Sequence, residues 1–186
     1  SKVNSDYLND QRDTGPKTHG EFNKVVLDFY HIHKFTDKIN FKYYGSLQHA
    51  SKNLDSSEKF SLGGVSGVRA YPSGEASGDE GHKLSLELQY DLSKPDMNFD
   101  LIGTLFYDYG KIRQYKDASN ITLTTPNEYS LSGWGVSFDL IANERVKLNL
   151  GWAQAIGDND GKSSSGNNSD GRGGSSRAWF QVVFRF

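Results

Sequence analysis

The stretch Phe60-Ser-Leu-Gly-Gly-Val-Ser-Gly-Val-Arg-Ala-Tyr-Pro-Ser-Gly-Glu-Ala-Ser-Gly-Asp-Glu-Gly81 decides how the rest of the chain is interpreted. Its six glycines predict that neither a helix nor a long strand runs through it. Apolar residues, among them Val65 and Val68, surround the single positive charge of Arg69. A loop that folds back against other protein can bury these groups and direct Arg69 at an anion. A long flexible hairpin connection is the plainer interpretation of the same composition.

Length and composition limit the classes of protein that fit. The chain has 186 residues, of which 35% are hydrophobic, and a mean hydropathy of −0.67. It lacks the roughly 20-residue apolar run of a transmembrane helix, which the alternating strands of a β-barrel do not need. The net charge of −2 favours no nucleic acid partner, and the absence of cysteine excludes a disulfide framework. No signal peptide is visible, so either the chain is part of a longer protein or it is not exported.

Seven segments alternate apolar and polar residues as strands do. The clearest alternation lies between His82 and Asp91, where Leu84, Leu86 and Leu88 share one face. In the first segment both faces are apolar, so its orientation stays open between Val25, Leu27, Phe29 and Val26, Tyr30, Ile32. No helix is expected. The segments are 19–34, 38–51, 82–91, 98–110, 128–141, 145–155 and 177–186.

The connections between these segments alternate in length. Short turns follow the first, third and fifth segments, and long polar stretches follow the second, fourth and sixth. Bacterial outer-membrane barrels carry short periplasmic turns and longer extracellular loops. We therefore expect an all-β, antiparallel transmembrane barrel with extracellular loops at 1–18, 111–127 and 157–176. Aromatic residues at the ends of the apolar faces fit the membrane interfaces: Tyr90, Tyr107, Tyr109, Trp152 and Phe186.

The order of residues in the glycine-rich stretch resembles the signature loop of the haemolysin secretion/activation proteins, which are two-partner-secretion transporters in the polypeptide-transporting β-barrel superfamily. The loop is expected over 52–81. Phe106, Asp108 and Gly110 resemble the wall motif that accompanies this loop. One departure is Ala70, where the superfamily usually has glycine. The loop residues that carry the resemblance are Gly67, Val68, Arg69, Ala70, Tyr71, Gly74, Glu75, Gly78 and Asp79.

The resemblance implies that residues 1–186 are the last seven strands of a sixteen-strand barrel. Upstream it implies a signal peptide, a plug helix, POTRA domains and the earlier strands. The function implied is the export of one large partner exoprotein, a haemolysin or adhesin, across the bacterial outer membrane. Outer-membrane lipid and the barrel-assembly machinery are the other expected partners. The signal for that machinery would be the final strand, with Phe180, Val182, Phe184 and Phe186.

We expect the signature loop to fold into the barrel and Arg69 to pair with Asp108. Arg69 lies among apolar residues, so its charge needs an anion once the loop packs against the wall. Asp108 faces inward two strands later, and a guanidinium can meet a carboxylate through two parallel hydrogen bonds.

Three alternatives stay open: an outer-membrane-protein assembly barrel, a passive porin and a soluble all-β binding module. No enzyme is expected, because the chain has no nucleophile elbow and no phosphate-binding loop. No cofactor or metal is expected either. His31 and His33 share a face but have no third ligand at a suitable spacing. Asp158, Asp160 and Asp170 lack the spacing of a calcium loop.

Overall fold

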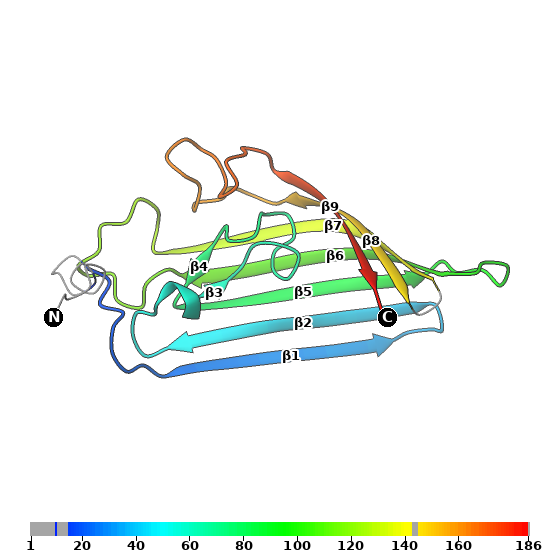
Figure 1. The fold of residues 1–186 in the computed structure, drawn as a ribbon, viewed down its shortest axis with the longest axis horizontal. Helices are drawn as coiled ribbons and strands as arrows, with labels where there is room; N and C mark the ends of the chain where they lie inside the picture. Colours follow the sequence, from blue (N-terminus) through cyan, green and yellow to red (C-terminus); the bar gives the residue numbers. More distant parts are fainter. Residues whose placement is uncertain (1–9, 11–14, 143–144, 186) are drawn as a thin grey trace.

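The computed structural model describes residues 10, 15–142 and 145–185. Seven long strands form one antiparallel sheet in the order β1-β2-β5-β6-β7-β8-β9 (Figure 1). The strands are β1 (Lys24–Lys34), β2 (Ile39–Ala50), β5 (Glu80–Asp91), β6 (Asp100–Arg113), β7 (Glu128–Ala142), β8 (Val146–Ala155) and β9 (Ser176–Phe184). The predicted number of strands and their sequential antiparallel pairing are confirmed.

The signature loop, residues 51–79, connects β2 to β5. It contains a single 3-10 turn, η1 (Ser56–Glu58), and two short paired strands, β3 (Phe60–Ser61) and β4 (Ser77–Gly78). Figure 1 shows the sheet as a curved, open wall with this loop lying across the middle strands. Within the described ranges, β1 and β9 each pair with one neighbour, so the wall is not closed. No helix in those ranges is long and apolar enough to span a membrane.

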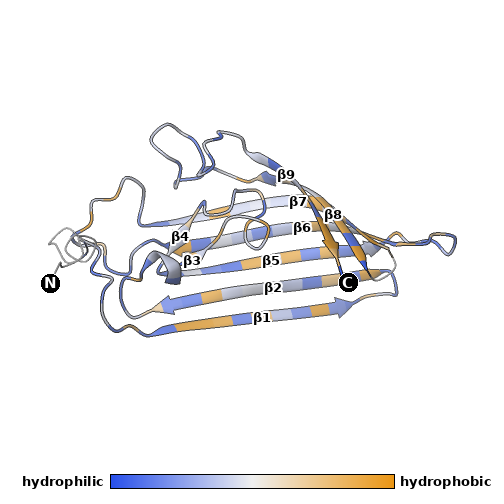
Figure 2. Ribbon diagram, viewed as in Figure 1, coloured by the Kyte–Doolittle hydropathy of each residue, from blue (hydrophilic) through white to orange (hydrophobic). Residues whose placement is uncertain are grey.

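The two faces of the sheet differ in chemistry, as the alternation predicts. On β6 the outward Leu105 is 51% exposed, whereas the adjacent inward Thr104 is 6% exposed. The same alternation colours the strands orange and blue in Figure 2. The orientation of β1 is settled by its register, because Leu27 pairs with the outward Leu47. Val25, Leu27 and Phe29 therefore face outward with Leu47.

The long connections lie at one end of the sheet and the short turns at the other (Figure 1). Several strand ends differ from those expected. Glu80 pairs with Arg113 and Gly81 with Ile112, so β5 begins earlier and β6 ends later than the alternation suggested. The connections are accordingly 51–79 rather than 52–81, 114–127 rather than 111–127, and 156–175 rather than 157–176. Strand β1 begins at Lys24, and most of the expected loop 1–18 lies outside the described residues.

Cross-strand ion pairs explain the early start of β5 and the late end of β6. On the outward face, Arg113 contacts Glu80 at 3.4 Å and Glu128 at 3.3 Å. Lys111 contacts Glu128 at 3.0 Å. We call Glu80, Lys111, Arg113 and Glu128 the charged rim. Apolar alternation stops at these residues, but paired charges continue to support the ladder.

Candidate functional site

The signature loop shares one apolar core with the inner face of the sheet. The loop contributes Phe60, Leu62, Val68, Ala70, Tyr71 and Ala76, and the sheet contributes Phe106, Ile112, Tyr129, Leu131 and Ala153. Val68 and Leu62 are fully buried. Burial of this apolar surface holds the loop against the sheet and excludes the flexible hairpin connection.

The loop is a folded hairpin with tight turns. The Leu62 amide donates to Ala76 O at 3.0 Å, and the Gly67 amide donates to Gly64 O at 3.0 Å. Gly74 lies at a turn with φ +77°, and Gly78 pairs with Phe60 in the β3–β4 ladder. These bonds present Arg69 to the sheet on a fixed backbone.

Arg69 and Asp108 form the ion pair expected from the sequence. Arg69 Nε donates to Asp108 Oδ2 at 2.8 Å and Nη2 donates to Oδ1 at 2.8 Å. The Arg69 backbone amide also donates to Oδ2, at 3.0 Å. The Asp108 side chain is 1% exposed and that of Arg69 is 9% exposed. This bidentate contact fixes both the position and the orientation of the loop.

A second carboxylate completes the Arg69 site. Arg69 Nη1 donates to Glu87 Oε1 at 2.8 Å. Glu87 also accepts from Tyr44 Oη at 3.1 Å and contacts Lys42 Nζ at 3.1 Å. The guanidinium lies 3.5 Å from the centre of the Phe106 ring, so the first residue of the wall motif also contacts Arg69. Sequence reasoning missed Glu87, although a carboxylate on the inward face of the strand after the loop was a usable signal.

Arg69 stays charged in this setting. Burial by itself lowers the pKa of Arg69, but the hydrogen bonds and the charge of Asp108 offset this effect. The pKa therefore lies above its ordinary value. We call Arg69, Glu87 and Asp108 the arginine lock.

Two glycines of the sheet make room for the loop. A Cβ atom on Gly110 would lie 2.4 Å from Leu62 Cδ2, and a Cβ on Gly133 would lie 2.5 Å from Ala70 Cβ. Gly110, the last residue of the wall motif, therefore lets Leu62 of the loop approach the backbone of β6 closely. In the described ranges Lys17 is the non-glycine residue with a positive φ, so the backbone at Ala70 does not require glycine. The extra methyl group of Ala70, where the superfamily usually has glycine, is accommodated by the absence of a side chain at Gly133 on β7.

Glu75 joins the signature loop to the β8–β9 connection. Its carboxylate accepts from Asn159 Nδ2 and, at 2.7 Å, from the Ser169 amide. Asn159 Nδ2 also donates to Asn168 Oδ1 at 3.1 Å. Glu75, Asn159 and Asn168 are all buried, and no ion pair to Glu75 is present among the described residues. We call this contact the glutamate clasp.

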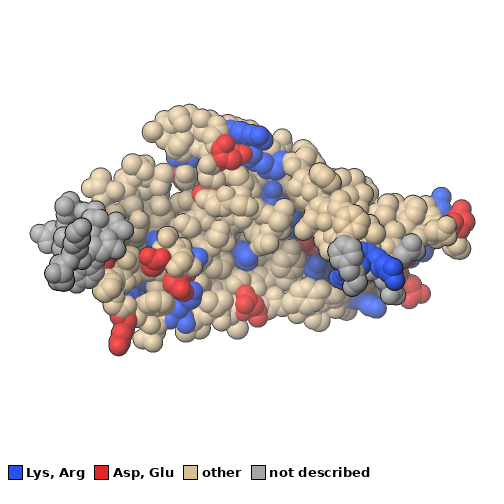
Figure 3. Space-filling model, viewed as in Figure 1, with Lys and Arg blue, Asp and Glu red and all other residues tan. Residues whose placement is uncertain are grey.

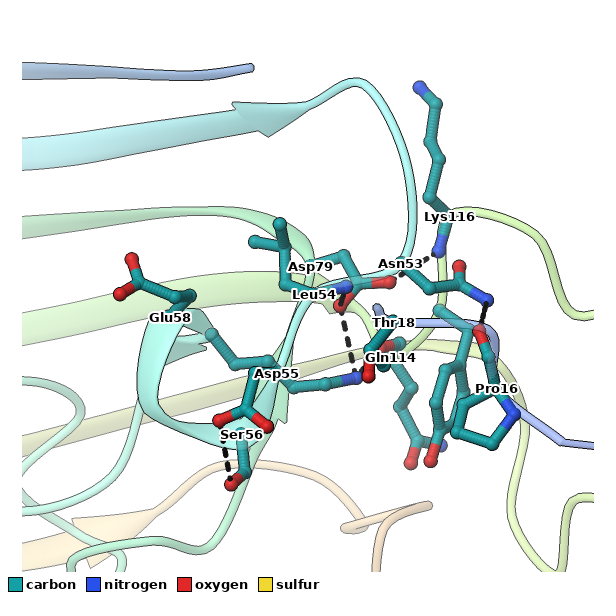
Figure 4. Close-up of polar contacts among 12 residues, drawn as sticks. Pro16, Thr18, Asn53, Leu54, Asp55, Ser56, Glu58, Asp79, Gln114 and Lys116 are labelled. Carbon is teal, nitrogen blue, oxygen red and sulfur yellow. Dashed lines mark hydrogen bonds and ion pairs between the residues drawn. The ribbon is translucent and has the colours of Figure 1, made fainter. Parts of the chain in front are cut away.

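Asp79 anchors the base of the loop, as Figure 4 shows. Its fully buried carboxylate accepts from the Leu54 amide at 3.0 Å and from the Lys116 amide at 2.8 Å. Lys59 Nζ lies 3.0 Å from Asp79 Oδ1. Asn53 extends the network by donating to Pro16 O at 2.7 Å. The base of the loop is therefore attached to the 114–127 connection through Lys116 and to the segment before β1 through Pro16. Sequence reasoning did not predict these contacts.

Other residues of interest lie elsewhere. Phe180, Val182 and Phe184 face outward on β9, and Phe186 lies outside the described residues. The His31 ring packs on Tyr43, and His33 packs edge-on against Phe35. Burial raises the pKa of Tyr71 to about 12, so this side chain stays neutral in the core. A hydrogen bond from Arg177 lowers the pKa of Asp170.

Comparison with known proteins identifies the family. The model of the haemolysin secretion/activation protein family ShlB/FhaC/HecB matches residues 5–140. The chain belongs to this family. Membership sets aside the soluble binding module and places the chain in the bacterial outer membrane, as predicted.

Named relatives agree with this family. The heme/hemopexin transporter protein HuxB of Haemophilus influenzae strain 86-028NP is 34% identical over 112 residues, which is 60% of this chain and 20% of the relative. HuxB of strain Rd is 35% identical over the same length. The chain thus spans about a fifth of the length of these curated relatives.

Solved structures show the same fold. CdiB from Escherichia coli matches with a TM-score of 0.71 at 17% identity, covering 95% of this chain and 30% of that one. CdiB from Acinetobacter baumannii matches with a TM-score of 0.54 at 18% identity, covering 87% of this chain and 27% of that one. The curved wall therefore has the fold of part of these solved structures.

Proposed function

We propose that this chain is the C-terminal part of an outer-membrane pore that exports a large partner exoprotein, a haemolysin or adhesin, by two-partner secretion. The arginine lock carries the proposal, because it fastens a long loop to the inner face of the wall. A passive porin has no need of a charge-fixed loop of this sequence. Transport through a pore involves no bond-making step, so we propose no enzymatic activity.

The open edges of the sheet fit a larger barrel. Unpaired strand edges are not tolerated in lipid, so β1 and β9 require further strands to pair with. Sixteen strands in all, with POTRA domains and a plug helix, is the arrangement that we propose for the whole protein. Long connections would then face the exterior and short turns the periplasm.

The outward face is proposed to contact lipid and the last strand to engage the barrel-assembly machinery. Phe180 and Phe184 are the most exposed aromatic side chains on this strand, and the two-residue series continues to Phe186. Replacing Phe186 by a polar residue in the full-length protein should lower the yield of folded, heat-modifiable barrel. Unchanged yields at ordinary expression levels would contradict this part of the proposal.

The function is tested by deleting the gene in its own host. We expect one large exoprotein to be lost from the medium, while the porins of the outer membrane fold normally. A general loss of folded porins would instead show an assembly barrel. Normal secretion of every exoprotein, with altered permeability to small solutes, would show a passive porin.

A further inference from the structure

A row of polar side chains crosses the inner face at one level. Gln89 pairs with Thr104, and Thr104 pairs with Ser137. Two residues further along β7, Asp139 pairs with Asn149, which pairs with Gln181. Each of the strands β5 to β9 thus contributes to a continuous row. We call these six residues the polar belt.

The belt lies next to the tip of the signature loop. All six residues line one cavity of about 400 Å³, together with Val65 and Ser66 of the loop. Val65 is 58% exposed, unlike the apolar residues of the loop core. In Figure 1 the loop covers the part of the sheet nearer the long connections and leaves the part nearer the short turns uncovered.

Much of the hydrogen-bonding capacity of the belt is unused. In the described part of the chain, the side chains of Thr104, Ser137 and Gln181 make no hydrogen bond. Asn149 is oriented by its neighbours, since it donates to Asp139 at 2.8 Å and accepts from Trp179 Nε1 at 2.8 Å. Thr104 and Ser137 are 6% and 5% exposed, whereas Gln181 is exposed and Gln89, Asp139 and Asn149 are half-buried. The belt therefore offers donors and acceptors to a guest chiefly through these last four residues.

The charges around the cavity cancel. Lys42 is paired with Glu87, and Lys147 lies 3.2 Å from Asp139. Arg69 is neutralised by Asp108 and Glu87. In Figure 3 basic and acidic atoms are interspersed on this side of the molecule, without a large patch of one sign.

We propose that the polar belt is the surface on which an extended, unfolded polypeptide slides through the pore. This proposal rests on the proposed function and adds the part of the wall that contacts the cargo. Peptide N–H and C=O groups recur along any sequence, and amide and hydroxyl side chains can hydrogen-bond both. Passage requires binding that is favourable enough to enter and weak enough to leave, spread over several sites.

Charge neutrality is the second requirement that the belt satisfies. An unpaired charge in a pore would retain segments of opposite charge and repel segments of the same charge. A long exoprotein presents both kinds of segment in turn. Paired charges and neutral polar groups let both pass at similar rates.

Cross-linking tests the contact directly. Benzoylphenylalanine is placed at Gln89 or Gln181 of the full-length transporter, and the partner exoprotein is stalled by fusion to a disulfide-locked domain. We expect cross-links from both positions to the stalled exoprotein. The control is Leu105, which faces outward beside Thr104 and should give none. Cross-links from Val65 without any from the belt would overturn the proposal.

Charge substitution tests the second requirement. Gln181, the exposed residue of the belt, carries the substitutions. Gln181→Lys should slow export of a cargo with an inserted acidic segment by about fivefold relative to a basic segment, and Gln181→Glu should reverse the order. Gln181→Asn is the neutral control and should treat both cargoes alike. Equal rates for all variants would overturn the proposal. A wild-type protein that exports neither cargo would overturn the proposed function itself, and with it the role of the belt.

Discussion

The arginine lock and the glutamate clasp hold the same loop in different ways. In the lock, a guanidinium on the loop meets two carboxylates on β5 and β6, which are paired strands of one sheet. In the clasp, a carboxylate on the loop meets amide groups of the β8–β9 connection. The first attaches the loop to the rigid wall, and the second attaches one connection to another.

Because of this difference, breaking the lock and breaking the clasp should cost different amounts of free energy. Removing one partner of a buried ion pair leaves an uncompensated charge and costs about 3–5 kcal/mol. Hydrogen bonds to a charged group are worth roughly 1.5–3 kcal/mol, and a substitution that keeps one acceptor loses only part of this. The lock should therefore govern the position of the loop, while the clasp can open without disturbing the sheet.

Reversing the charge of one lock residue should have the largest effect. Arg69→Asp brings a third carboxylate beside Glu87 and Asp108, and Asp108→Arg places two guanidinium groups together. Each change should abolish most export by the full-length protein, measured as exoprotein in the medium. The double variant should recover part of it. Recovery should increase when Glu87→Gln is added, because the reversed pair no longer faces that carboxylate. Two single variants that secrete normally would contradict this role of the lock.

Truncating one side of the lock should have the next largest effect. Asp108→Ala leaves Arg69 with Glu87 alone and should destabilise the packed loop by about 3–5 kcal/mol. The measurement is the rate of protease cleavage within 51–79 in the folded, full-length barrel. Glu128→Ala is the control, since its pair with Lys111 is half-exposed and should contribute roughly 0–1 kcal/mol. Equal cleavage of the two variants would show that the lock does not hold the loop.

The contact between Ala70 and Gly133 should give a smaller effect of steric origin. Gly133→Ala adds a methyl group where Ala70 already lies, and overpacking of this kind costs about 1–3 kcal/mol. Ala70→Gly in the same chain should restore part of the stability in a denaturant titration, because the added Cβ also lies 3.0 Å from the backbone oxygen of Gln154. Gly174→Ala, where the added atom meets open space, is the matched control. A double variant no more stable than Gly133→Ala would refute the steric explanation.

Changing the clasp should have the smallest effect. Glu75→Gln keeps one acceptor oxygen but turns an NH₂ group toward donors, so the loss should be roughly 1 kcal/mol. Protease should then cut the 156–175 connection faster, while 51–79 stays protected and export continues. Matching increases in cleavage at both connections would mean that clasp and lock open together.

The sequence predicts those features of the structure that follow from residues close together in the chain. Strand faces follow from apolar alternation, and the Arg69–Asp108 pair follows from a charge in an apolar loop and an inward carboxylate. The contact of Glu87 with Arg69 depends on the register between β5 and β6, which alternation alone does not fix. The partners of Glu75 lie in a Gly/Ser/Asn stretch whose composition resembles any solvated loop. The start of β5 and the end of β6 extend past the expected positions because paired charges replace apolar residues there.

The charged rim also fixes the vertical position of the protein in its membrane. Lys and Arg side chains on the lipid-facing side of a barrel cost about 2–4 kcal/mol at the bilayer midplane and little at the interface. The hydrocarbon boundary must therefore lie below Lys111, which leaves the outward residues of β6 from Tyr109 to Leu101 within it. At about 3.3 Å per residue this segment is roughly 26 Å long. With a strand tilt of about 40° it spans roughly 20 Å, slightly less than the roughly 25 Å apolar band typical of outer-membrane barrels.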